Sequence, residues 1–286
     1  MSDSPRSYRR FHLGQRIEHI LLILSFTVLA ITGVPQKYSN FAWSDAMIQA
    51  MGGIEWVRVI HRTAATLLMA ETIYHFLSVA YKVWVKRIAL TMLPGWQDVK
   101  DAWQTLLYNL RLTDKMPIMG RYTFGEKVEY WAVIWGTVIM VITGFMLWNP
   151  IATVRFFPGQ FIPAAKAAHG GEALLAVLSI VTWHIYNVHV KHFNRSMFTG
   201  FISRHEMEIE HPQELKSLSV VSVAKSMPEG AIARRRRLFL PVAAILSIAL
   251  FWGLYTFVTF EDTAITTVPK TNVEIYAPLT PTATPP

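Results

Sequence analysis

The chain has 286 residues, of which 52% are hydrophobic and only 16% are charged. Soluble domains carry about 25% charged residues, so this composition favours a polytopic membrane protein. The formal net charge of +8 does not indicate nucleic-acid binding, because the cations alternate between loops. The chain has no cysteine, which excludes thiolate-bound iron–sulfur clusters, c-type haem and disulfides within it.

Five apolar runs are long enough to cross a membrane as helices. In chain order they cover residues 14–34, 56–81, 128–148, 168–190 and 238–260. The predicted fold is an all-α membrane protein, with a four-helix transmembrane bundle followed by a fifth, C-terminal transmembrane helix. We divide the chain into a four-helix domain (1–202), a cytoplasmic linker (203–237), the fifth helix (238–260) and an extended Thr/Pro-rich outer tail (261–286).

Lysine and arginine alternate between successive loops. Residues 1–18, 82–127 and 191–237 carry four, eight and nine of them, whereas 35–55, 149–168 and the tail after 260 carry one, two and one. Because cytoplasmic loops hold the positive charge, we expect a cytoplasmic N-terminus and an outer C-terminus in a bacterial inner membrane. Within the second basic loop, apolar side chains at helical spacing predict an interfacial amphipathic helix over 96–108.

Half of the ten histidines lie inside or at the ends of the apolar runs: His19, His61, His75, His169 and His184. Ionisable side chains are costly in hydrocarbon, so an intramembrane histidine indicates a function. His61 and His75 are 14 residues apart, and His169 and His184 are 15 apart. At 100° per residue the members of each pair are offset by roughly 40° and 60° and share a helix face.

The two histidines on each helix are separated by roughly 21–23 Å along its axis, most of the thickness of a bilayer core. Such helices could hold two metal centres stacked across the membrane, and bis-histidine haem is the obvious candidate. The topology places His61 and His169 near the outer surface. The inner centre has three candidates for two positions: His19, His75 and His184. The competing interpretation of any single histidine is a hydrogen bond to a neighbouring helix.

Short motifs follow one another in a fixed order over roughly residues 10–215. They are Arg16-Ile17-Glu18-His19, Thr32-Gly33, Gly120-Arg121-Tyr122, Gly125-Glu126-Lys127, Thr143-Gly144 and His184-Ile185-Tyr186. In order and spacing they resemble the gamma subunit of respiratory formate dehydrogenases. That subunit is a membrane cytochrome b, related to the cytochrome b of nickel-iron hydrogenases.

The resemblance implies two b-type haems and electron exchange with a quinone, either menaquinone or ubiquinone. Carried over, His61 and His169 bind the outer haem, and His19 and His184 bind the inner one. In the formate subunit the two fourth-helix histidines are one residue closer together than here. His75 has no counterpart there, so it stays open as a rival ligand, a quinone-side residue or a ligand of a third haem.

The resemblance also places the quinone on the cytoplasmic side, with Tyr122, Thr123 and Glu126 in the walls of its site. The Glu126 carboxylate could move protons, or it could only complement the positive end of the helix dipole. We expect an outer redox partner, either an iron–sulfur protein or a multihaem cytochrome c, in a hetero-oligomeric complex. A broader group of membrane b cytochromes that serve multihaem c cytochromes fits the pattern equally well.

The predicted function is that of an integral membrane cytochrome b subunit in a respiratory redox complex. It would carry electrons between the outer partner and the quinone pool, in contact with membrane lipid and not with nucleic acid. The alternatives are a haem-free membrane anchor and a proton-relay transporter subunit. The sequence lacks the paired Gly/Pro interruptions that transporter helices carry. An anchor would not need histidines at two depths.

Overall fold

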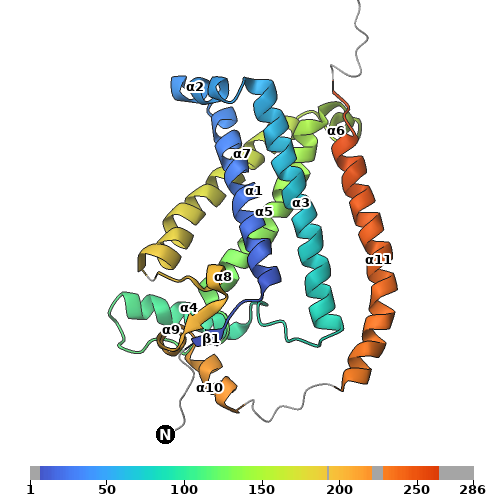
Figure 1. Ribbon diagram of the computed structural model, residues 1–286. Helices are drawn as coiled ribbons and strands as arrows, with labels where there is room; N and C mark the ends of the chain where they lie inside the picture. The colour runs from blue at the N-terminus through green and yellow to red at the C-terminus, as the bar shows by residue number, and fades with distance from the viewer. Residues whose placement is uncertain (1–6, 192, 221–227, 264–286) are drawn as a thin grey trace, which may run out of the picture.

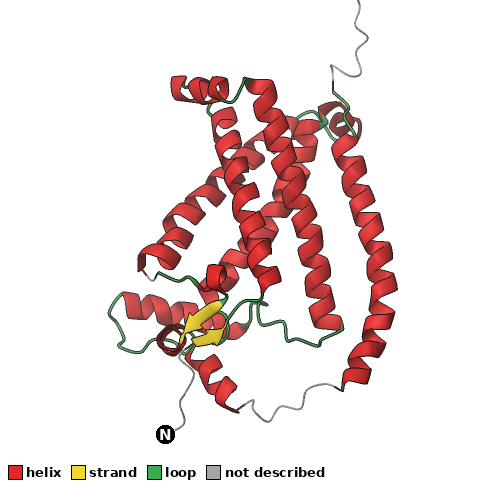
Figure 2. Cartoon of the chain, viewed as in Figure 1, coloured by secondary structure: helices red, strands yellow, loops and turns green. Residues whose placement is uncertain are grey.

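The protein is almost entirely helical, and its long helices run between two ends of the molecule (Figure 1, Figure 2). The computed structural model describes residues 7–191, 193–220 and 228–263. The long elements are α1 (Leu13–Lys37), α3 (Ile54–Trp84), α5 (Phe124–Trp148), α7 (Phe161–Ser179) with the π turns η1 (Ile180–His184) and η2 (Tyr186–Lys191), and α11 (Glu229–Thr259). Helix α1 packs on α3 and α7, α5 packs on α7, and α11 packs on α3.

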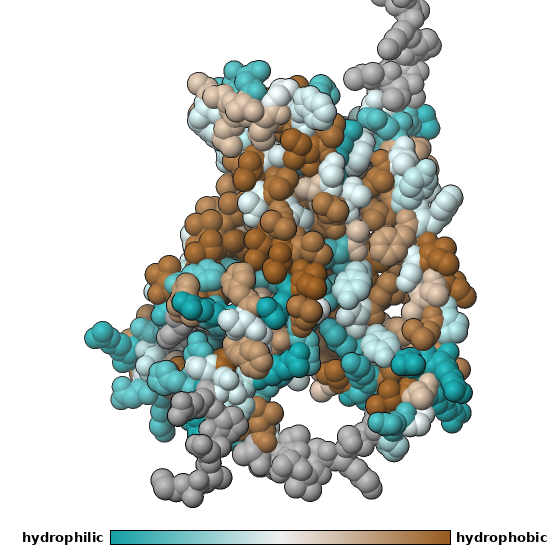
Figure 3. Space-filling model, in the orientation of Figure 1, coloured by the Kyte–Doolittle hydropathy of each residue, from teal (hydrophilic) through white to brown (hydrophobic). Residues whose placement is uncertain are grey.

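Helix α1 buries polar side chains and exposes apolar ones, as a membrane solvent allows. On α1 the side chains of Glu18, Ser25 and Thr32 are buried, whereas Leu24 and Ile31 are exposed. The hydroxyls of Ser25 and Thr32 donate to carbonyls four residues earlier in the helix, so they need no water. Figure 3 shows apolar side chains over the middle of the visible face and polar side chains toward its lower end.

Among the described residues, four helices are long and apolar enough to cross a membrane: Leu13–Lys37, Phe124–Trp148, Phe161–Lys191 and Glu229–Thr259. These match four of the five predicted spans. The remaining prediction, 56–81, falls within α3, which is as long as α11. Helix α3 carries Glu55, Arg58, Arg62, Glu71 and Lys82, and these charges lower its mean hydropathy. Its crossing of the membrane therefore stays a prediction.

Short elements cover the two ends of the bundle. At the upper end of Figure 1 are α2 (Ala42–Ala50) and α6 (Pro150–Phe156). At the lower end are β1 (Ser7–Arg9), α4 (Trp96–Asn109), α8 (Ser196–Thr199), β2 (Phe201–Ser203), α9 (Arg204–Glu210) and α10 (Pro212–Val220). Helix α4 matches the amphipathic helix expected over 96–108, and it exposes Trp96 and Trp103.

Much of the segment expected to be a linker is folded against the lower end of the bundle. Strand β2 pairs antiparallel with β1, with Tyr8 opposite Ile202. Ile202 and Met207 are almost completely buried. Helices α9 and α10 follow directly. The rest of the expected linker at 221–227, and the expected outer tail from 264 onward, lie outside the described residues.

Candidate functional site: two facing histidine pairs

Four of the five histidines in the predicted apolar runs meet in two pairs. Near the upper end, the His61 ring on α3 faces His169 on α7, with ring centroids 6.4 Å apart and an interplanar angle of 61°. Near the lower end, His19 on α1 and His184 on η1 have centroids 6.4 Å apart at 47°. The upper pair is the one expected from the sequence, the lower pair is the one that the family resemblance implies, and each pair joins two different helices.

A threonine hydroxyl orients each ring of the His61–His169 pair. Thr32 Oγ1 lies 2.6 Å from the carbonyl of Val28 and 2.8 Å from His61 Nδ1. The hydroxyl hydrogen goes to the carbonyl, so its oxygen accepts from the Nδ1–H of the imidazole. A neutral imidazole protonated at Nδ1 keeps its Nε2 lone pair, which is the one that binds a metal.

The same arrangement is repeated on the other half of the pair. Thr143 on α5 lies 2.7 Å from the Ile139 carbonyl and 2.9 Å from His169 Nδ1. The following residue is glycine in both helices. A Cβ on Gly33 would lie 3.2 Å from His61 Cε1, and one on Gly144 would lie 3.4 Å from His169 Cε1. Each Thr-Gly pair thus supplies both a hydrogen-bond acceptor and the space for the ring.

This geometry fits bis-histidine ligation of a haem iron. A metal–imidazole bond is about 2 Å long, so two rings bound on opposite sides of one metal have centroids roughly 6 Å apart. Both pairs have this spacing, and the threonine contacts of the His61–His169 pair favour the required tautomer. No group of three or more histidine, aspartate or glutamate side chains suited to a metal ion occurs within the described residues.

In the His19–His184 pair a carboxylate, and not a threonine hydroxyl, contacts a ring Nδ1. His184 Nδ1 lies 2.7 Å from Glu129 Oε2 on α5, and a carboxylate that accepts from a ligating histidine makes it more basic. His19 Nδ1 is buried, and no described residue hydrogen-bonds to it. Glu129 is therefore placed to orient His184.

A π turn brings His184 into register with His169. In an unbroken α-helix, 15 residues would offset the two by roughly 60°. Residues Ile180–His184 form η1, and the wider π turn takes up about one extra residue. The pair then has the geometry of a 14-residue α-helical spacing. The resemblance implies one residue fewer between these two histidines, and the extra residue of the π turn matches that difference.

His75 lies near the lower pair but has both ring nitrogens engaged by the protein. Its Nδ1 lies 2.6 Å from Glu18 Oε2 on α1, and its Nε2 lies 3.0 Å from the Tyr130 hydroxyl on α5. Glu18 precedes His19 and Tyr130 follows Glu129, so the chain Glu18–His75–Tyr130 lies beside the lower histidine pair. Among the residues that the structure describes, no second histidine ring pairs with His75.

The three residues expected near a quinone lie at the lower start of α5. Thr123 and Glu126 form a capping box, in which Glu126 N donates to Thr123 Oγ1 and Thr123 N donates to Glu126 Oε2. Arg10 forms an ion pair with Glu126 at 3.4 Å. The Tyr122 ring lies under the guanidinium groups of Arg10 and Arg121.

Beneath these residues is a cluster of buried charge that sequence reasoning missed. Arg10 pairs with Glu214 of α10 at 3.0 Å, and Arg121 pairs with it at 2.6 Å. His211 is almost fully buried and donates from Nδ1 to the Gly120 carbonyl at 2.9 Å. Burial and the nearby Arg10 lower the pKa of His211, whereas burial and the neighbouring Glu126 raise the pKa of Glu210.

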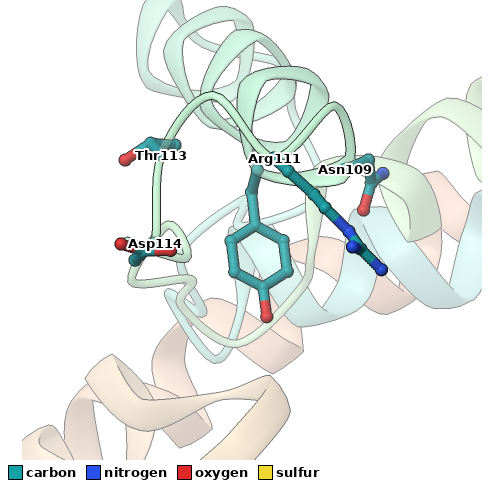
Figure 4. Close-up of a pocket in the computed structure, with 5 residues that line it drawn as sticks. Asn109, Arg111, Thr113 and Asp114 are labelled. Atoms are coloured by element: carbon teal, nitrogen blue, oxygen red, sulfur yellow. The ribbon is translucent and has the colours of Figure 1, made fainter.

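A surface hollow at the end of α4 is unrelated to these groups. Figure 4 shows its lining by Asn109, Arg111, Thr113 and Asp114, with Tyr108 between them. None of the paired histidines or their partners lines it, so it has no part in the site.

These observations define a helical membrane protein in which two facing histidine pairs lie at different depths. No family model matches the chain. It is similar, however, to the cytochrome b556(fdo) subunit of formate dehydrogenase from Escherichia coli K12, with 24% identity over 208 residues, 71% of this chain and 90% of that subunit. A cytochrome b556 subunit of formate dehydrogenase from Haemophilus influenzae is 24% identical over 209 residues, 71% of this chain and 80% of that protein.

The nitrate-inducible cytochrome b556(Fdn) subunit of E. coli K12 is 19% identical over 213 residues, 74% of this chain and 92% of that subunit. The resemblance to membrane cytochrome b subunits that the motifs predicted is thereby confirmed. The extent of the matches agrees with the roughly 200 residues that carry those motifs.

Proposed function

We propose that the chain is a dihaem cytochrome b subunit of a respiratory complex, with α3 as the second of five membrane spans. The observation that carries the proposal is the pair of facing histidine pairs, each with ring centroids 6.4 Å apart. His61 and His169 would hold one b-type haem, and His19 and His184 the other. When bound, each haem accepts and returns one electron.

The protein residues around each pair have defined tasks in this proposal. Thr32, Thr143 and Glu129 accept from Nδ1 and so hold the rings with Nε2 toward the iron. Because both nitrogens of His75 are engaged by Glu18 and Tyr130, its geometry favours two haems rather than three. His75 is then a partner of the inner centre and not a ligand.

The outer partner and the quinone rest on the relatives and on the charge pattern. The relatives are subunits of formate dehydrogenase complexes. We extend this to a periplasmic redox partner, an iron–sulfur protein or a multihaem cytochrome c, and to menaquinone or ubiquinone at the cytoplasmic face. The lysine and arginine distribution supports a cytoplasmic N-terminus and an outer C-terminus.

The decisive experiment is the reduced-minus-oxidised absorbance spectrum of the purified chain with its haem-to-protein ratio. We expect two b-type haems per chain. His61→Ala and His169→Ala should each lose the same haem, and His19→Ala and His184→Ala the other. His189→Ala, which removes a histidine outside both pairs, is the matched control and should keep both. A wild-type chain without haem would favour the anchor or proton-relay alternative.

For the quinone we propose a site against the inner haem, with Tyr122, Thr123 and Glu126 in its walls. Reduction of a quinone to a quinol takes two electrons and two protons, and the partly exposed Glu126 carboxylate can reach cytoplasmic water. Its ion pair with Arg10 and its capping box favour the competing structural role.

Glu126→Gln separates the two roles, because glutamine keeps the cap but carries no proton. The relay predicts a pH-dependent loss of quinone-linked turnover with both haems retained. Glu206→Gln is the matched control, since Glu206 forms the equivalent capping box with Ser203 at the start of α9. Unaltered turnover and inhibitor binding in both Glu126→Gln and Tyr122→Phe would move the site elsewhere, with the outer face as the next candidate.

A further inference from the structure

The lower ends of α3 and α11 are joined by a small aromatic contact. Phe239 of α11 lies with its ring centroid 5.6 Å from that of Tyr81 and 6.0 Å from that of Trp84 on α3. Arg235 donates from Nη1 to the Trp84 carbonyl at 3.0 Å. Aromatic rings and arginine at the end of an apolar helix are typical of the headgroup layer of a membrane.

Around this contact positive charge is not balanced by acidic side chains. Four consecutive arginines, Arg234–Arg237, precede the apolar part of α11. Lys82 lies in the last turn of α3, and Lys86 and Arg87 follow the end of that helix. The sequence has no acidic residue between 72 and 97, and Glu229 is the only one between 217 and 260. Within the described part of the chain, Arg234, Arg236 and Arg237 form no ion pair.

An exposed apolar stripe continues from the arginines along one side of α11. Leu238, Ile245, Ile248 and Trp252 are 58%, 70%, 71% and 66% exposed. They follow Arg234 at helical spacing and therefore share its face. Phe239 and Arg235 point instead to α3. From Leu238 to Ile248 the stripe is about 15 Å long, roughly half the thickness of a hydrocarbon core.

A shallow surface depression lies at the arginine end of this stripe. Gly230, Ala233, Arg234, Arg237 and Leu238 line a shallow depression on α11. The small side chains at 230 and 233 leave room beside the two guanidinium groups. Figure 3 shows polar side chains gathered at the lower end of α11, below the more apolar part of the helix.

We propose that this corner binds an anionic phospholipid. Guanidinium groups bind phosphate oxygens with paired hydrogen bonds, so Arg234 and Arg237 would hold the headgroup phosphate. The acyl chains would lie along the Leu238–Ile248 stripe within one leaflet. The cations of α3 and α11 repel one another, and the bound headgroup would relieve that repulsion and stabilise the packing of α11 on α3.

The test is thermal unfolding of the full chain in detergent, with phosphatidylglycerol or phosphatidylcholine added. We expect the unfolding temperature to rise to a plateau with phosphatidylglycerol, and neither phosphatidylcholine nor inorganic phosphate to raise it. The triple substitution Arg234→Gln, Arg236→Gln, Arg237→Gln should weaken the apparent affinity about a hundredfold, because each cation near an anionic surface contributes about 1 kcal/mol.

A second triple variant controls for bulk charge. Lys100→Gln, Arg111→Gln, Lys115→Gln removes the same charge from the α4 region at the same end of the molecule. It should keep the response to phosphatidylglycerol. Equal losses in both triple variants, or an equal response to phosphatidylcholine, would show only nonspecific attraction and overturn the proposal. The readout does not involve haem, so it is independent of the function proposed above.

Discussion

Thr32 and Thr143 perform the same task on different helices. Each hydroxyl donates to its own helix and leaves an oxygen that accepts from the Nδ1–H of a histidine on the neighbouring helix. This fixes both the tautomer and the ring orientation of the His61–His169 pair. In the proposed dihaem subunit, a side chain that does not touch the iron would thus decide which ring nitrogen faces it.

Thr32→Val tests this at nearly constant volume. Without the acceptor His61 becomes less basic, so we expect the midpoint potential of the outer haem to rise. The affinity of the chain for that haem should fall by about 10- to 100-fold. The inner haem should not change. Thr66→Val is the control, because within the described residues the Thr66 hydroxyl donates to the Arg62 carbonyl of its own helix and contacts no histidine. A potentiometric titration that gives the same outer potential in both variants would contradict the role.

His75 is expected to be dispensable for haem content. Its nitrogens are held by Glu18 and Tyr130, and within the described residues its ring pairs with Tyr130 and not with a second histidine. We predict that His75→Ala and the milder His75→Gln both keep two haems per chain. The inner haem should nevertheless shift in its spectrum or potential, since Glu18 would lose its partner beside His19. Loss of the inner haem in His75→Gln, with its retention in His19→Ala, would reverse the assignment.

Residue spacing predicted the His61–His169 pair, the family resemblance added His19–His184, and neither predicted the surroundings of the rings. Depth and helical period follow from the sequence of one helix, and they suffice to match His61 with His169. The acceptor for a ring nitrogen is supplied by another helix, so it depends on packing. The Thr-Gly pairs at 32–33 and 143–144 were visible as a repeat. The repeat directs attention to the glycines, whereas the threonines make the hydrogen bonds.

At the scale of elements, the π turn η1 changes the rotation of His184 relative to His169 from the value that a regular α-helix would give. The π turn takes up about one residue between His169 and His184, so removing one residue there should restore a regular helix. We predict that deletion of the exposed Val181 keeps both haems. Insertion of one alanine after Val181 should rotate His184 by a further 100° or so and remove the inner haem.

The control for this prediction is the same deletion in a helix without a π turn. Leu24 lies between His19 and Thr32 on α1, where every turn is α-helical. Its deletion should rotate one of these two residues by about 100° relative to the other and disturb a haem centre. If the two deletions cause equal loss of haem, η1 does not tolerate the removal of a residue better than a regular helix does, and the prediction is wrong.

The lower-end cluster should give the fold a dependence on pH. Burial lowers the pKa of His211 below its ordinary value of 6.5, so the unfolded chain binds a proton that the folded chain does not. Stability therefore falls as the pH drops through 6.5 toward the lowered pKa. The raised pKa of Glu210 acts in the opposite sense. We predict that His211→Asn loses less thermal stability than the wild type between about pH 7.5 and 5.5. Equal losses would exclude His211 as the source.

The periodicity and hydropathy of the sequence predicted those helices well whose surface lies in a single medium, either lipid or the membrane interface. The amphipathic α4 and the four most apolar spans match their predicted ranges. Composition was a poor guide for residues 203–220, because their polar side chains form buried ion pairs with Arg10 and Arg121. These ion pairs join residues more than 90 positions apart, so no periodicity in the local sequence indicates them.

For the whole molecule the open question is the path of α3 across the membrane. Five spans put the chain termini on opposite sides, whereas four would put them on the same side. Helix α3 packs between α1 and α11 and supplies His61, so the two-haem proposal requires it to cross. Its charges need not prevent this, because Glu71 and His75 lie along the part of the helix that faces Glu18 and Tyr130, and Arg62 stacks on Trp148.

The absence of cysteine makes this crossing directly testable, since any introduced cysteine is the only thiol in the chain. Ser39 and Ala89 are exposed and lie on either side of α3. In intact spheroplasts a membrane-impermeant maleimide should label Ser39→Cys and not Ala89→Cys, because the positive loops stay in the cytoplasm. Gly159→Cys should be labelled and Ser217→Cys protected, and disruption of the membrane should expose all four. Labelling of Ser39→Cys and Ala89→Cys alike in intact spheroplasts would mean that α3 does not cross, and His61 could not then lie one membrane depth away from His19.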